Sequence, residues 1–119
     1  MIGGGILMSI TYFISSDTIG YQDPELGKRL MHSFCMKLLE AAEKPSHILF
    51  LEKGVQLLLP EFSAVDALKI LAEESGVTLL ACVTCLDYYG IKDKIKVGEV
   101  STMPEIIAVM HESDKVIHI

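Results

Sequence analysis

The stretch LLACVTCLDYYG, residues 79–90, decides how the rest of the chain is interpreted. It passes from a wholly apolar segment through two cysteines into an acidic and aromatic segment. Residues 77–84, VTLLACVT, are almost entirely apolar, which is typical of a strand buried on both faces of a parallel sheet. Thr84 and Asp87 have the spacing of a capping box, which marks the start of a helix. The stretch therefore predicts a central strand that passes directly into a helix.

Helix signals recur on both sides of this stretch. Asp23-Pro24 predicts a helix that runs to about Lys44, with an apolar stripe made by Leu26, Leu30, Phe34 and Leu38. The capping-box spacing predicts two further helix starts, at Ser63 with Asp66 and at Thr102 with Glu105.

Four more strands are predicted from short segments rich in β-branched and apolar residues, at 10–16, 47–54, 96–101 and 115–119. The strands alternate with helices, and parallel neighbours in a sheet need such crossover connections. The sequence therefore predicts an α/β fold, a three-layer α/β/α sandwich with a five-stranded parallel sheet. A chain of 119 residues makes one such domain, which we place at residues 9–119 after an N-terminal extension, residues 1–8.

Composition excludes several classes of protein. Half of the residues are hydrophobic and 22% are charged, which excludes a disordered chain. The net charge of −6 and the absence of a Lys/Arg cluster argue against nucleic acid or a membrane surface as a partner. No apolar run reaches the roughly 20 residues that span a bilayer, and no signal peptide is recognisable. We expect a cytoplasmic protein whose three cysteines are reduced.

Ligands of open parallel sheets bind at the carboxyl ends of the strands. The residues that follow the predicted strands are therefore candidates for lining a pocket or holding an anion, namely Ser15, Ser16, Asp17, Thr84, Leu86, Asp87, Tyr88 and Ser101. Serine and aspartate after a strand are also ordinary turn residues, and a tyrosine there can simply pack on the sheet.

Cys85 is the candidate for chemistry. If Thr84 is the N-cap, Cys85 is the first helical residue and lies beside unpaired N–H groups. That position stabilises a thiolate and predicts a pKa lowered from ~8.5 toward ~7.5, which Asp87 would partly oppose. A buried, inert thiol at a helix start is the alternative.

Four segments carry a resemblance to a known family: ISSDTIG, ELGKRLMHSF, TCLDYYGIKDKIKVGEVS and DKVIHI. They resemble the DsrE/DsrF-like sulfurtransferases over residues 9–119, and most closely the C-terminal domain of YedF-type selenium-metabolism proteins. The resemblance implies a parallel α/β sandwich, frequent oligomers, and a cysteine that carries sulfur as a persulfide in relay proteins. Cys85 is the residue that corresponds to this cysteine. For this chain we expect a homo-oligomer and no cofactor.

The other cysteines are interpreted as packing residues. Cys82 lies three residues before Cys85, and in an extended strand the two would point to opposite faces, which argues against a redox pair. Cys35 lies beside the predicted helix stripe. His32 and Cys35 supply only two of the four ligands that zinc usually takes, so we expect no metal site.

The function predicted from these observations is a sulfur relay, in which Cys85 carries sulfane sulfur or selenium between donor and acceptor proteins. Two alternatives remain, a noncatalytic DsrE-like binding or assembly subunit and a small-anion-binding sensor. The apolar run of Val55 with Leu57, Leu58 and Leu59 is expected to contact another subunit or to roof the Cys85 pocket.

Overall fold

The structure, a computed structural model, describes residues 8–119. The predicted N-terminal extension lies outside the described residues, apart from Met8. Five parallel strands form one sheet: β1 (Ile10–Ile14), β2 (His47–Phe50), β3 (Thr78–Cys82), β4 (Glu99–Ser101) and β5 (Lys115–His118). The strands alternate with four α-helices and one 3₁₀ helix: α1 (Pro24–Leu38), η2 (Glu52–Leu58), α2 (Val65–Glu74), α3 (Val83–Tyr89) and α4 (Met103–Glu112). The predicted α/β/α sandwich is confirmed.

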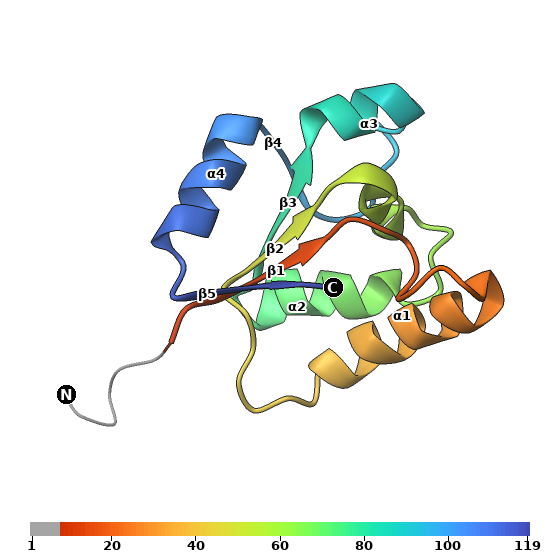
Figure 1. Cartoon of the computed structure of the whole chain (residues 1–119), viewed down its shortest axis with the longest axis horizontal. Coiled ribbons are helices and arrows are strands. Elements are labelled where there is room, and N and C mark those ends of the chain that lie inside the picture. Colours follow the sequence, from red (N-terminus) through yellow and green to blue (C-terminus); the bar gives the residue numbers. More distant parts are fainter. Residues whose placement is uncertain (1–7) are drawn as a thin grey trace.

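The sheet order explains on which faces α1, α2 and α4 lie. The strands lie in the order β4-β3-β2-β1-β5, and all four pairings are parallel. Parallel crossovers are right-handed in about 98% of cases, so steps in one direction place their helices on one face, and a return step uses the other. The steps from β1 to β3 place α1 and α2 on one face, and the return to β5 places α4 on the other (Figure 1).

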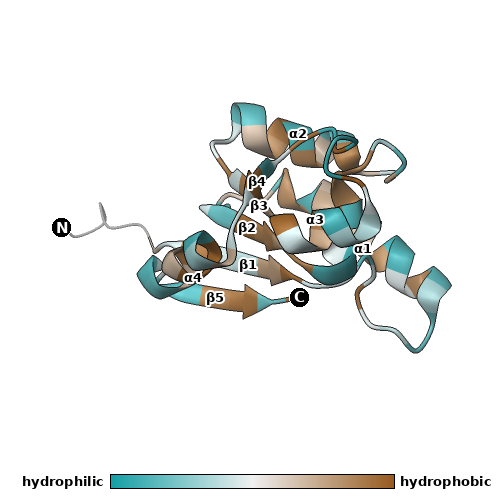
Figure 2. Ribbon diagram, turned by 90° about the horizontal axis from the view of Figure 1, so that it is seen from above, coloured by the Kyte–Doolittle hydropathy of each residue, from teal (hydrophilic) through white to brown (hydrophobic). Residues whose placement is uncertain are grey.

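The core follows the two-residue period of the strands. In β2, Ile48 and Phe50 belong to the larger buried cluster on the α1 and α2 side, whereas Leu49 belongs to a smaller cluster with Ile106 of α4. These three of the four β2 side chains are fully buried, as expected for a strand covered on both faces. Figure 2 shows apolar residues along the strands and also on the helices.

Helix α1 begins where the sequence predicts, because the Asp23 carboxylate accepts a hydrogen bond from the Leu26 N–H at 3.2 Å. Its predicted stripe is only partly right, since Leu38 is buried and Phe34 is partly buried, but Leu26 and Leu30 are exposed. The buried residues of the helix are Gly27, Met31, Cys35 and Leu38. Gly27 sets this face by packing closely on Thr18 in the preceding loop. The helix also ends earlier than predicted, at Leu38 rather than near Lys44.

Removing this cap gives a first prediction. The variant Asp23→Ala is expected to lower the free energy of unfolding by about 1 kcal/mol, because one N–H of the first helical turn loses its partner. Urea denaturation monitored by circular dichroism measures the change. Asp93→Ala is the control, because no hydrogen bond or ion pair joins the Asp93 side chain to another residue of 8–119. Equal losses in the two variants would show that the cap contributes nothing.

The apolar run after β2 forms the 3₁₀ helix η2 and is buried in the chain's own core. Val55, Leu57 and Leu58 are at most 1% exposed, and none of them lines the cavity beside Cys85. For these three residues, the expectation that the run contacts another subunit or roofs the Cys85 pocket is therefore wrong. Leu59 is half-buried and does not line the Cys85 cavity, and its contact with another subunit stays a prediction. The run is long and apolar because η2 closes the carboxyl end of the sheet.

The other predicted helix starts need correction in detail. Helix α2 begins after Ala64 without a side-chain cap, and the Ser63 hydroxyl instead lies 2.7 Å from His32 Nδ1. Thr102 is the N-cap of α4 but its side chain makes no capping hydrogen bond. In the described part of the chain, no helix is long and apolar enough to cross a membrane.

Candidate functional site

Cys85 lies in the first turn of α3, at the carboxyl end of β3. The helix begins at Val83 with Cys82 as the N-cap, so Cys85 is the third helical residue rather than the first. Thr84 lies inside the helix, so the prediction that Thr84 is the N-cap is wrong. The Cys85 Sγ accepts a hydrogen bond from the Glu52 N–H at 3.1 Å, which joins the start of η2 to the start of α3.

A cavity of about 320 Å³ opens beside this sulfur, lined by Glu52, Thr84, Cys85, Tyr88 and Tyr89. The two tyrosine rings lie edge to face with their centroids 5.2 Å apart. Tyr88 is 82% exposed, so the rings form an open wall rather than a lid. The cavity is large enough for a small group on Cys85 but leaves the sulfur accessible to a second protein.

Glu52 is a site residue that the sequence did not indicate. Its φ of 51° is the only positive φ of a non-glycine residue in the described chain. For a residue with a side chain, this left-handed conformation costs about 1–2 kcal/mol. The strained position begins η2 and supplies the N–H that bonds to Cys85 Sγ.

The electrostatic setting of Cys85 differs from the one predicted. Partial burial raises the pKa of the Cys85 thiol, and the hydrogen bond from the Glu52 N–H only partly opposes this. The Cys82 thiol and the Glu52 carboxylate raise the pKa further. The expected lowering is therefore contradicted, because the thiol is partly desolvated and has acidic neighbours. A smaller fraction of Cys85 is therefore thiolate at neutral pH than in a free thiol.

Cys82 and Cys85 are closer than the sequence suggested. The predicted opposition of their side chains assumed an extended strand through both residues, but the strand ends at Cys82. N-cap and third-residue side chains lie together at a helix start. The Cys82 thiol is close enough to raise the pKa of Cys85, and Cys82 is only 2% exposed.

Cys35 is far from this chemistry. It is 1% exposed on the buried face of α1, and burial raises the pKa of its thiol to about 12. The interpretation of Cys35 as a packing residue agrees with this position. Cys85 is thus the only one of the three free cysteines that is not buried.

The three candidates that follow β1 lie apart from Cys85. The Ser15 hydroxyl is 2.8 Å from His118 Nε2 at the end of β5, and the Ser16 hydroxyl bonds to Thr18. Asp17 lines a different cavity. None of the three lines the cavity beside Cys85.

The remaining candidates divide between the cavity and other roles. Thr84 and Tyr88 line the Cys85 cavity, whereas Leu86 is fully buried in the core. Asp87 pairs with Lys92 on the surface, at 3.9 Å. Ser101 is buried and donates a hydrogen bond to the Glu105 carboxylate, so its hydroxyl already has a partner within the chain.

No group of three or more His, Cys, Asp or Glu side chains that could hold a metal ion occurs within residues 8–119. The Cys85 cavity itself contains one thiol and one carboxylate, with no lysine or arginine on its walls. This composition suits thiol chemistry better than the binding of an anion, which needs positive charge or several free N–H groups.

Comparisons with known proteins agree with the architecture. The crystal structure of the ychN protein from E. coli superposes with a TM-score of 0.70, covering 95% of this chain and all of that one at 19% sequence identity. This likeness shows a shared fold. No curated protein matches the chain. A model of the DsrE/DsrF-like family matches residues 8–119. The chain therefore belongs to the DsrE/DsrF-like family.

Proposed function

We propose that this protein is a sulfur-relay carrier that holds sulfane sulfur as a persulfide on Cys85. The observation that carries the proposal is the setting of Cys85, the one cysteine that is not buried, with its sulfur at a cavity and bonded to the Glu52 N–H. Membership of the DsrE/DsrF-like family supports it, because the family is linked to sulfur relay.

The transfer needs no redox cofactor. The Cys85 sulfur attacks the outer sulfur of a donor persulfide, a new S–S bond forms at Cys85, and the donor's S–S bond breaks. The bonding pair leaves on the donor sulfur, which takes up a proton and becomes a thiol. An acceptor thiol then attacks the outer sulfur on Cys85 and regenerates the Cys85 thiol. Selenium can take the place of the transferred sulfur in the same steps.

Glu52 has two roles in this proposal. Because the pKa of Cys85 is raised, its thiol must lose a proton before it attacks, and the Glu52 carboxylate in the same cavity is a proton acceptor. The Glu52 N–H, already directed at Sγ, then stabilises the thiolate that forms. The open wall of Tyr88 and Tyr89 leaves room for the donor and acceptor proteins to reach the sulfur.

One observation favours a second candidate, a noncatalytic assembly subunit. The raised pKa of the Cys85 thiol, which partial burial causes, is what a structural thiol would show. Homo-oligomer formation belongs to both candidates and stays a prediction. The anion-binding alternative is disfavoured by the carboxylate of Glu52 in a cavity without basic residues.

Persulfide formation separates the two candidates. After incubation with inorganic polysulfide and desalting, the intact mass is expected to rise by one sulfur atom, and peptide mapping is expected to place that atom on Cys85. The adduct should disappear on reduction with dithiothreitol. Cys85→Ser should abolish it, whereas the control Cys35→Ser should load as the unmodified chain does. Absence of an adduct on Cys85 would favour the assembly subunit.

A further inference from the structure

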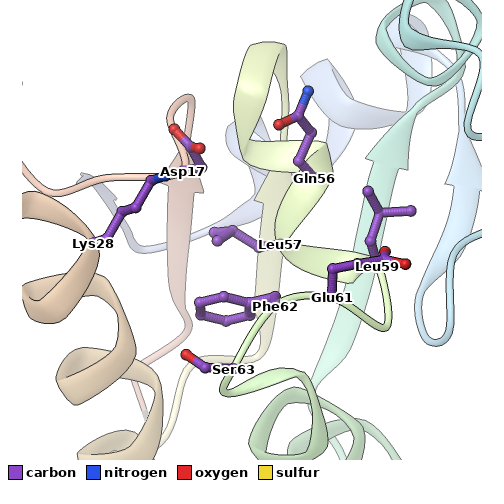
Figure 3. Close-up of a pocket in the computed structure, with 8 residues that line it drawn as sticks. All are labelled: Asp17, Lys28, Gln56, Leu57, Leu59, Glu61, Phe62 and Ser63. Atoms are coloured by element: carbon purple, nitrogen blue, oxygen red, sulfur yellow. The ribbon is translucent and has the colours of Figure 1, made fainter. Parts of the chain in front are cut away.

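A second cavity, of about 340 Å³, lies between α1 and η2 and does not include Cys85 (Figure 3). It is lined by Asp17, Lys28, Gln56, Leu57, Leu59, Glu61, Phe62 and Ser63. Four separate segments contribute these residues: the loop after β1, helix α1, helix η2 and the loop before α2. Pockets for small ligands measure about 300 to 1,000 Å³, so this one suits a ligand at the small end of that range.

The charged groups of this cavity have no partners of their own. Within residues 8–119, no ion pair and no side-chain hydrogen bond involves Lys28, Asp17 or Glu61. Figure 3 shows the Lys28 ammonium directed toward Asp17 across the mouth of the cavity. An ammonium and a carboxylate that face a cavity without pairing can each accept a group of opposite charge from a ligand.

Polar and apolar groups are separated in this cavity. Asp17, Lys28 and the Gln56 amide lie at one end, while the Phe62 ring and the Leu57 side chain lie below them (Figure 3). Leu57 is only 1% exposed, so it forms part of a fixed floor rather than a mobile surface. Such an arrangement recognises a molecule with a charged head and a short apolar body.

We propose that this cavity binds a small zwitterion, an α-amino acid with an aliphatic side chain. Lys28 pairs with its carboxylate, Asp17 with its ammonium group, and the aliphatic side chain packs on Phe62 and Leu57. A simple anion fits poorly, because two carboxylates and one ammonium line the cavity and the chain carries a net charge of −6. A simple amine would leave Lys28 without a partner.

Asp17 relates this cavity to the Cys85 cavity. The Asp17 carboxylate makes the smallest contribution to the raised pKa of Tyr89, after partial burial, Glu52, Tyr88 and Cys85. Asp17 therefore lies within electrostatic reach of the Cys85 cavity, but no residue lines both cavities. Zwitterion binding and sulfur loading can consequently be tested separately.

The proposal is tested by titrating the protein with leucine and measuring binding by calorimetry and by chemical-shift changes in the protein. Isopentylamine and isocaproate are the matched probes, because they lack the carboxylate and the ammonium group of leucine, respectively. Leucine is expected to bind saturably and at least roughly tenfold more tightly than either probe, since each probe leaves one charged group without a partner. The shifted resonances should belong to residues of α1 and η2.

Two variants assign the charges. Lys28→Met and Asp17→Asn are each expected to weaken leucine binding by roughly tenfold or more, through loss of one charged hydrogen bond. Lys37→Met is the control, because it removes an exposed lysine of the same helix that pairs with Glu40 outside the cavity. No saturable binding, equal affinity for leucine and the two probes, or an equal loss in Lys37→Met would overturn the proposal. Polysulfide loading of Cys85 in Lys28→Met should be unchanged.

Discussion

Gly54→Ala is expected to lower the free energy of unfolding by about 3 kcal/mol or more, which is the upper range for overpacking a closely fitted core position. A Cβ at this position would lie 2.3 Å from the carbonyl oxygen of Ile14 and 3.0 Å from its carbonyl carbon. Both atoms are backbone, so no side-chain rotation relieves the clash. The same Ile14 oxygen accepts the Leu51 N–H at 3.0 Å, so β1 and η2 would have to separate.

Urea denaturation at 25 °C measures this loss, and Gly76→Ala supplies the comparison. Gly76 has a φ of +73° but no heavy atom within 4 Å of the added Cβ, so its substitution costs only the left-handed conformation, about 1–2 kcal/mol. A Gly54→Ala variant that unfolds at the same urea concentration as Gly76→Ala would refute the close approach of η2 to β1.

The three thiols are expected to differ widely in their rates of alkylation. In the native protein Cys85 is expected to react with iodoacetamide, while Cys35 reacts only in molecules that have unfolded. For a domain of ordinary stability, this requirement lowers the labelling rate of Cys35 by roughly a thousandfold or more. Cys82 should also be protected, because it is only 2% exposed. Brief labelling followed by peptide mapping gives the three rates.

The pH dependence of this labelling follows from the raised pKa of Cys85. Since the thiolate is the reacting species, a raised pKa leaves less of it at neutral pH than in a free thiol. The rate should therefore still be rising where that of N-acetylcysteine amide has levelled off. Cys85→Ser should remove the fast labelling altogether. If the labelling rate levels off at a lower pH than that of the free thiol, the pKa of Cys85 is lowered, as the sequence predicted for a thiolate at the helix start.

The layered fold was predictable because it depends on patterns of several residues. The apolar run of β3 between two helical segments indicates a central parallel strand, and the structure places β3 between β2 and β4. The face of α1 was not predictable in the same way. Two stripes, one through Leu26 and one through Gly27, both have helical spacing, and contact with Thr18 selects the second.

The candidate site was predictable only in part. The place of Cys85 at a strand-to-helix junction could be predicted from local sequence, because apolar and capping signals meet there. The contributions of Glu52 and Cys82 could not. Glu52 reaches Cys85 from 33 residues away through a left-handed backbone conformation, and the closeness of Cys82 depends on a helix that begins two residues earlier than the capping box indicates.

Because the chain returns from β4 to β5 at its end, the sheet is completed late. β1 lies between β2 and β5, and the Ser9 N–H next to β1 bonds to the Asp114 carboxylate 105 residues later. At synthesis rates of about 5 to 20 residues per second, this partner reaches β1 roughly 5 to 20 s after β1 itself is made. During that interval the nascent chain exposes an unpaired strand edge, which is where another chain can add. Contacts over such sequence distances also slow folding, so this edge closes late in refolding as well.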